Sequence, residues 1–100
     1  MSSATQTLYR GAAATSSTTL YTSPVGVPIA VTNIAITNTT TSAATATVNL
    51  ATVALVSSVS VAANTTQFID LEQILFNGET ITGSASTTGV NFHIAGFEVY

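Results

Sequence analysis

Residues 44–50, Ala-Thr-Ala-Thr-Val-Asn-Leu, alternate an apolar with a polar side chain at every step. A period of two places one set of side chains on one face of an extended strand and the other set on the opposite face. The threonines and the valine are β-branched, and β-branched residues favour strands over helices. The stretch therefore predicts a strand with one face in a core and the other face outside it.

The same alternation recurs along the chain, and no segment holds a sustained period of 3.6 residues. Turn-forming residues separate the alternating runs, for example Pro24-Val25-Gly26, Asn77-Gly78 and Thr88-Gly89. These features predict an all-β fold: a single antiparallel β-sandwich, jelly-roll-like, of about eight short strands. The expected strands are residues 5–10, 18–22, 29–38, 44–50, 59–61, 66–71, 80–85 and 90–100.

Two places depart from simple alternation. The apolar residues of the last expected strand change parity between Ile94 and Phe97, which predicts a β-bulge at Ala95-Gly96. In residues 71–75, Leu-Glu-Gln-Ile-Leu, the apolar side chains stand three or four apart, which predicts a single helical turn between two strands. Residues 11–17 are small and featureless. We therefore divide the chain into residues 1–17, an N-terminal arm or edge strand, and residues 18–100, the β-sandwich domain.

Charge is the scarcest property of the chain. Only five of its 100 residues are charged and none is a lysine, whereas an average domain is roughly a quarter charged. A folded chain of this mass exposes on the order of 5,300 Å², or about 1,000 Å² for each charge. Hydroxyl and methyl surfaces are cheap to desolvate when a partner covers them, so the composition predicts an assembly component. The five charged residues are Arg10, Asp70, Glu72, Glu79 and Glu98.

The same composition argues against several other classes of protein. Binding to a phosphate backbone needs several Lys or Arg, but the net charge is -3 with one basic residue, so no nucleic-acid partner is expected. The chain has no cysteine, which excludes disulfides and thiolate metal sites. Its N-terminus lacks the features of a signal peptide, and its most apolar stretch, residues 51–63, is too short to span a bilayer. We expect no membrane association.

Catalysis is not expected, because the residues that could perform it lack positioned partners. His93 is the only imidazole and has no Cys, Ser or paired acid at motif spacing. Three copies of His93 around a threefold axis could bind Zn²⁺ or Ni²⁺, but an ordinary surface histidine is favoured, so we predict no metal and no cofactor. Asp70 is better explained by capping than by acid-base chemistry. The acceptor patterns at Asn38 and Asn64 are interpreted as turns, because glycosylation needs a secretory route.

Six short stretches follow one another in a fixed order between residues 20 and 99. They are Leu-Tyr-Thr-Ser-Pro-Val-Gly at 20–26, Val-Thr-Asn-Ile-Ala-Ile-Thr-Asn-Thr at 31–39, Ser-Ala-Ala-Thr at 42–45, Ala-Ala-Asn-Thr-Thr at 62–66 with Asp-Leu at 70–71, Asn-Gly-Glu-Thr-Ile at 77–81, and Gly-Val-Asn-Phe-His-Ile-Ala-Gly-Phe-Glu-Val at 89–99. Their order and spacing resemble a small β-sandwich module of tailed-bacteriophage structural proteins. The family is associated with capsid decoration and with tail or fibre attachment, so the resemblance implies a non-enzymatic protein located in the virion.

Composition and resemblance together lead us to expect a capsid decoration (cement) protein that binds and stabilises the shell as an oligomer, with a homotrimer favoured. Its partners would be further copies of itself and the major capsid protein or another virion protein. The alternative is a tail fibre, spike or head-tail attachment module that binds a receptor or a carbohydrate; the absence of Trp and the few aromatic residues disfavour it.

Five residues are expected at an interface. Arginine is suited to bidentate pairs across an interface, and tyrosine combines a large area with a polar tip. Residues 5–10 would pair as an edge strand with a neighbouring subunit or the shell, or else belong to the chain's own sandwich with Leu8 in the core; the sequence leaves both open. The expected interface residues are Leu8, Tyr9, Arg10, Tyr21 and Tyr100.

Overall fold

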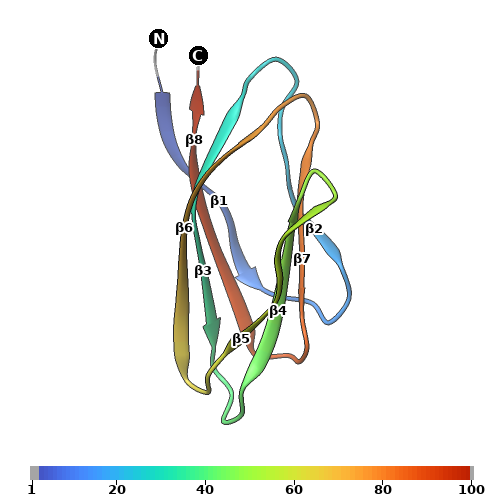
Figure 1. The fold of residues 1–100 in the computed structure, drawn as a ribbon. Helices are drawn as coiled ribbons and strands as arrows, with labels where there is room; N and C mark the ends of the chain where they lie inside the picture. Colours follow the sequence, from blue (N-terminus) through green and yellow to red (C-terminus); the bar gives the residue numbers. More distant parts are fainter. Residues whose placement is uncertain (1–2, 100) are drawn as a thin grey trace.

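The computed structural model describes residues 3–99, and these residues form two layers of β-strands facing each other (Figure 1). The expected all-β sandwich is confirmed. The strands are β1 (Ser3–Ala12), β2 (Thr18–Thr22), β3 (Ile29–Asn38), β4 (Ala44–Leu50), β5 (Val53–Val61), β6 (Thr65–Leu75), β7 (Thr80–Ala85) and β8 (Val90–Val99).

The strand order is that of a jelly roll. One sheet, here called sheet A, has the order β1-β8-β3-β6, and the other, sheet B, has the order β2-β7-β4-β5. All pairs are antiparallel. The pairs β1–β8, β2–β7, β3–β6 and β4–β5 are those of one long hairpin whose tip lies between β4 and β5. Rolling up that hairpin places its successive pairs alternately in the two sheets, which is how a jelly roll forms.

The core lies between the sheets and is built from the alternating side chains. Sheet A contributes isoleucines of β3 and Phe92 of β8, and sheet B contributes Val48 and Ile81; Phe92, Val48 and Ile81 are fully buried. Burying one such side chain stabilises the fold by about 1.5–3 kcal/mol. Thr45 of β4, which alternates with the buried Ala44 and Ala46, is exposed, as the period of two predicts.

β1 pairs with β8 of the same chain along its whole length, from Ser3 opposite Val99 to Ala12 opposite Asn91. Leu8 is 7% exposed and belongs to the core between the sheets. Of the two alternatives for residues 5–10, the structure therefore has the strand in the chain's own sandwich, where it forms one edge of sheet A.

The predicted helical turn at residues 71–75 is wrong, because β6 continues through this segment to Leu75. Gln73, Ile74 and Leu75 are paired with Val31, Ala30 and Ile29 of β3. The pairing satisfies backbone groups that a helical turn would have satisfied locally. Leu71 packs against the core and Leu75 is buried, while Ile74 points away, so the apolar spacing reflects a strand with apolar side chains on both faces.

The prediction of a β-bulge at Ala95-Gly96 of β8 is also wrong, because the extra residues lie in the partner strands. Burial alternates without a break through Phe92, Ile94 and Gly96, so β8 contributes no extra residue. The extra residues are Leu8 in β1 and Thr32 in β3, where the register against β8 shifts. A Cβ on Gly96 would collide with the carbonyl oxygen of Ala30, so glycine permits the close approach of the shifted strand.

β5 begins at Val53, six residues before the expected strand, because the β4–β5 turn carries no usual signal. Leu50 pairs with Val53, and the two turn residues, Ala51 and Thr52, both have positive φ, at 50° and 65°. This is the backbone of a two-residue type I′ turn, which Asn-Gly normally forms. Because Ala51-Thr52 is not a typical sequence for this turn, the sequence analysis did not predict the tight hairpin.

Candidate docking face

The candidate surface for a partner is the face of sheet A that points away from sheet B, where Phe68 and Ile74 are exposed. The described residues enclose no cavity or cleft, and no group of His, Cys, Asp or Glu among them could hold a metal ion. None of the described residues forms a helix long and apolar enough to cross a membrane.

Strand register fixes which side chains share this outer face of sheet A. Residues opposite each other in neighbouring strands point to the same side of the sheet. Because His93 is exposed and lies opposite both Arg10 and Ala35, all three lie on the outer face. The three central rows, read from β1 across β8 and β3 to β6, are Thr7-Ala95-Asn33-Asp70, Arg10-His93-Ala35-Phe68 and Ala12-Asn91-Thr37-Thr66.

On this face, exposed apolar side chains lie next to two alanines of β3. Phe68 is 67% exposed and Ile74 is 57% exposed, both on β6. Ala30 lies in register between Phe97 and Ile74, and Ala35 lies between His93 and Phe68. Both alanines are nearly buried although they are outside the core between the sheets, so the larger side chains around them cover them. Exposed phenylalanine and isoleucine beside small residues form a surface that is cheap to desolvate.

Hydrogen bonds between side chains hold the polar part of the face in place. Asn33 Nδ2 donates to Asp70 Oδ1 at 3.1 Å, and the hydroxyls of Thr37 and Thr66 are 3.0 Å apart. Both pairs join β3 to β6. Cross-strand pairs of this kind order the surface before any partner binds, which lowers the entropy that binding must offset.

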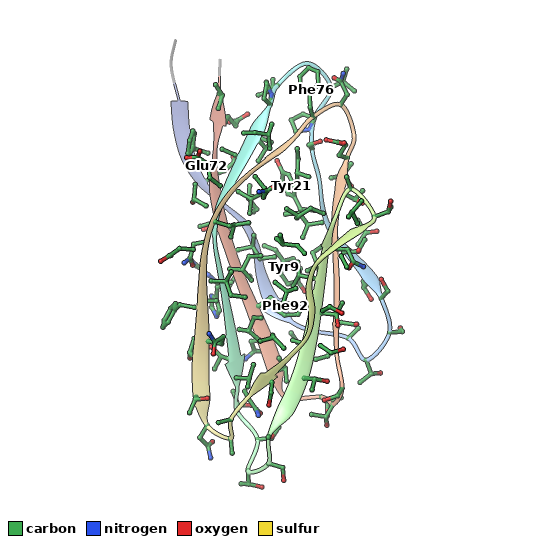
Figure 2. All side chains as sticks on the ribbon, viewed as in Figure 1. Tyr9, Tyr21, Glu72, Phe76 and Phe92 are labelled. Carbon is green, nitrogen blue, oxygen red and sulfur yellow. The ribbon has the colours of Figure 1, made fainter. Side chains whose placement is uncertain are left out.

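The structure does not bring the expected interface residues together. Leu8 is buried, and Tyr9 and Tyr21 are half-buried and pack against the core; Figure 2 shows both tyrosines between the two layers of strands, with Tyr9 next to Phe92. Arg10 alone among the described members is exposed on the outer face of sheet A. Tyr100 lies outside the described residues.

The two half-buried tyrosines have internal partners. The Tyr9 hydroxyl donates to the carbonyl oxygen of Ala12 at 2.9 Å, and its ring lies along Gly11, where a Cβ would be 3.1 Å from the hydroxyl oxygen. Gln6 Nε2 donates to the Tyr21 hydroxyl oxygen at 3.4 Å. Burial raises the pKa of Tyr21; the Gln6 hydrogen bond lowers it and the charge of Glu98 raises it further.

Sequence patterns missed Phe68 and Ile74, the largest exposed apolar side chains of the face. A signal was present in residues 66–71, Thr-Gln-Phe-Ile-Asp-Leu. Ile69 and Leu71 share the inward parity and pack against the core, which leaves Phe68 on the same side as Asp70. In a strand with one buried face, an aromatic residue on the same side as an aspartate is expected to be exposed. This pattern could have identified Phe68 from the sequence.

The acceptor pattern at Asn38 is part of the structure's interior. Asn38 is fully buried at the end of β3, and its amide makes four hydrogen bonds within the fold. Asn64 has a φ of 55°, the left-handed backbone of a turn residue.

No family model, no curated protein and no solved structure matches the chain.

Proposed function

We propose that the protein is a non-enzymatic structural protein of a virion, which caps the shell as a decoration (cement) protein through the outer face of sheet A. The observation that carries the proposal is the exposure of two large apolar side chains, Phe68 and Ile74, on this face of sheet A. The assignment to a virion comes from the resemblance of residues 20–99 to structural proteins of tailed bacteriophages.

The surface of the chain supports a role in assembly. It measures 5126 Å² and carries the same five charges. An exposed charge keeps a protein apart from its neighbours, so a surface with about 1,000 Å² per charge is poorly protected against association. Covering the outer face of sheet A would remove Phe68 and Ile74 from water, and apolar area yields about 25 cal/mol per Å² before the costs of association.

Attachment to particles that lack the protein tests this proposal. Phe68→Ser and Ile74→Ser should each lower the affinity for the particles at least about tenfold, because buried apolar anchors dominate interface energetics. Val53→Ser is the matched control: Val53 is 68% exposed, but lies on β5 of sheet B. The measurement is co-sedimentation of purified protein with particles over a range of concentrations.

Two results would contradict the proposal. If Val53→Ser weakened attachment and the sheet A variants did not, the docking face would be on sheet B. If the wild-type protein bound isolated tails and not shells, the role would be that of a tail module. The copy number per virion gives an independent measure, because a decoration protein is present in many copies and a tail module in few.

A further inference from the structure

Sheet A has two open edges, one formed by β1 and the other by β6. Among the described residues, β6 pairs only with β3, and β1 pairs only with β8. β6 is an 11-residue strand that contains no Pro, Gly, Lys or Arg; residues 65–70 pair with β3 without a shift, and the one register shift of β6 lies beyond them, between Asp70 and Gln73. Natural sheets protect their edges with lysine, proline, bulges or short strands. β5, the neighbouring edge of sheet B, has such protection in two register shifts and a positive φ at Ser58.

The residues of β1 that direct backbone groups toward its free edge follow from one hydrogen bond. Ala13 N donates to Val90 O at 2.8 Å, so this opposed pair is a hydrogen-bonded pair. Such pairs alternate along an antiparallel ladder. Gly11 and Tyr9 therefore bond to β8, and Arg10 and Ala12 present their N–H and C=O groups to the free edge. The Ala12 carbonyl accepts the Tyr9 hydroxyl and retains a second lone pair.

The same reasoning applies to β6. Thr39 N donates to Gly89 O at 2.9 Å, so alternate residues of β3 from Thr39 bond to β8, and the residues between them bond to β6. Ile36 and Ile34 are among these, and their partners in β6 are Gln67 and Ile69. The residues of β6 whose backbone groups face the free edge are then Thr66, Phe68 and Asp70.

We propose that copies of this chain join edge to edge, with β6 of one copy pairing antiparallel with β1 of the next and Asp70 opposite Arg10. Both residues face a free edge and both point to the outer side of sheet A, so the pleat and the hydrogen bonds match in this register. The register also places Phe68 opposite the small Ala12. β1 and β6 run in opposite directions within sheet A, so the added strand continues its antiparallel order.

Charge selects β1 as the partner strand. Arg10 is the only Lys or Arg of the chain, and it lies on one edge of sheet A, while Asp70 and Glu72 lie on the other. Pairing β6 with β6 of a second copy would gather carboxylates on both sides of the seam with no cation between them. Opposite charges in a cross-strand pair stabilise a sheet, and like charges destabilise it. Asn33 already holds the Asp70 carboxylate on the outer face through Oδ1.

Each copy uses two different edges, so the contact is head-to-tail and makes a ring when its rotation closes. The ring would present the outer faces of all its sheets A as one continuous surface. This inference deepens the proposed function and takes from it only the expectation that the chain acts as an oligomer. Its test needs no particles, so the failure of one proposal is distinguishable from the failure of the other.

Charge reversal tests the register in solution. Arg10→Asp and Asp70→Arg should each raise the dissociation constant of the oligomer at least about tenfold, and the double variant should restore association. Ser60→Arg, at an exposed position of β5, is the control and should leave association unchanged. Sedimentation velocity of the full chain measures each variant, and circular dichroism verifies its fold.

Cross-linking gives a second measurement that does not depend on charge. Directly opposed residues of a hydrogen-bonded pair have Cα atoms about 5.5 Å apart, within the range that a disulfide spans. The chain has no cysteine, so the Arg10→Cys/Asp70→Cys variant should form intermolecular disulfides under oxidation, and Ser60→Cys should not. A monomeric wild-type chain, an oligomer indifferent to both reversals, or cross-linking by Asp70→Cys alone would overturn the proposal; the last would show that β6 pairs with itself.

Discussion

Asn38 is a fully buried polar residue whose amide joins three segments of the chain. Nδ2 donates to Ser42 O at 2.8 Å and to Val61 O at 3.0 Å, and Oδ1 accepts the Thr40 N–H at 2.9 Å and the Thr40 hydroxyl at 2.6 Å. The end of β3, the β3–β4 turn and the end of β5 are thereby fixed to one another. A buried polar group is stabilising only when its hydrogen bonds are complete, and those of Asn38 are.

Asn38→Ala should lower the free energy of unfolding by about 2–3 kcal/mol, because it removes all four hydrogen bonds of a fully buried amide. The control is Asn64→Gly, which changes the other Asn-Thr-Thr turn but keeps its left-handed backbone, and should change stability by less than about 0.5 kcal/mol. Urea denaturation measures both variants. Equal effects would mean that the buried network of Asn38 adds nothing to that of an ordinary turn.

Tyr21 links stability to alkaline pH. Its pKa is raised above the ordinary value of 10.0, chiefly by burial. The unfolded chain therefore loses this proton at a lower pH than the folded chain does. The contribution of Tyr21 is complete below the unfolded pKa and is lost as the pH rises through the folded pKa.

The free energy of unfolding should therefore fall as the pH rises above the ordinary tyrosine pKa of 10.0 and through the higher pKa of Tyr21 in the folded chain, and the fall should be smaller in Tyr21→Phe, which has no proton to lose. Urea unfolding at several pH values gives the free energies, and ultraviolet absorbance of tyrosinate follows the titration in the folded chain. An identical pH dependence in the wild type and in Tyr21→Phe would remove Tyr21 as the cause.

At the scale of the element, β8 is the strand around which sheet A is organised. It pairs with β1 on one side and β3 on the other; the register shifts against β1 between Ile94 and Ala95, and against β3 between Ala95 and Gly96. The shift lets Leu8 and Tyr9, neighbours in sequence, both turn toward the core. The irregularity of two strands thus depends on a glycine in a third.

Gly96→Ala should destabilise the fold by about 3 kcal/mol or more, because the new Cβ would meet backbone at Ala30 that has no room to move. Gly11→Ala is the matched control. Its Cβ would meet the side chain of Tyr9, which can rotate away, so the cost should stay below about 1 kcal/mol. Thermal unfolding measured by circular dichroism compares the two, and a smaller loss for Gly96→Ala than for Gly11→Ala would show that the β3–β8 contact is loose.

At the scale of the whole molecule, the chain is an elongated sandwich of 45 × 21 × 18 Å with open edges on both sheets. Its charges are too few to govern association. Exposed apolar side chains, hydroxyls and free backbone groups remain, and these act over short distances. Assembly should then depend on contact area and strand pairing, with one charge pair setting the register.

Attachment to particles should accordingly resist salt. Raising NaCl from about 0.1 M to about 1 M shortens the screening length from about 10 Å to about 3 Å, which weakens exposed charge pairs but leaves apolar contacts and hydrogen bonds intact. Less than about a threefold change in affinity is expected across this range. Release from the particles in the middle of the range would show that the few charges dominate the interaction.

The candidate docking face was only partly accessible to sequence analysis. Arg10 was recognised as an interface candidate and is exposed on sheet A. Tyr9 and Tyr21 were expected at an interface because tyrosine combines a large area with a polar tip, and Leu8 because residues 5–10 could pair with a partner, but the sandwich buries such residues wherever their parity faces inward. Phe68 was missed because the inward and outward sides of β6 were unassigned until β3 was known to be its neighbour.

The alternation of Thr, Ala, Val and Ile by itself determined that this chain forms strands, because a period of two is a local property that any partner strand satisfies. It gave the bounds of β2, β3, β4 and β7 as the structure has them. The tertiary structure alone decided the pairing of β1 with β8, the extension of β6 through residues 71–75, and the rows of the outer face. All three features depend on which distant strand supplies the hydrogen bonds. A contact between residues far apart in sequence does not change the periodicity of either segment, so the sequence pattern does not show it.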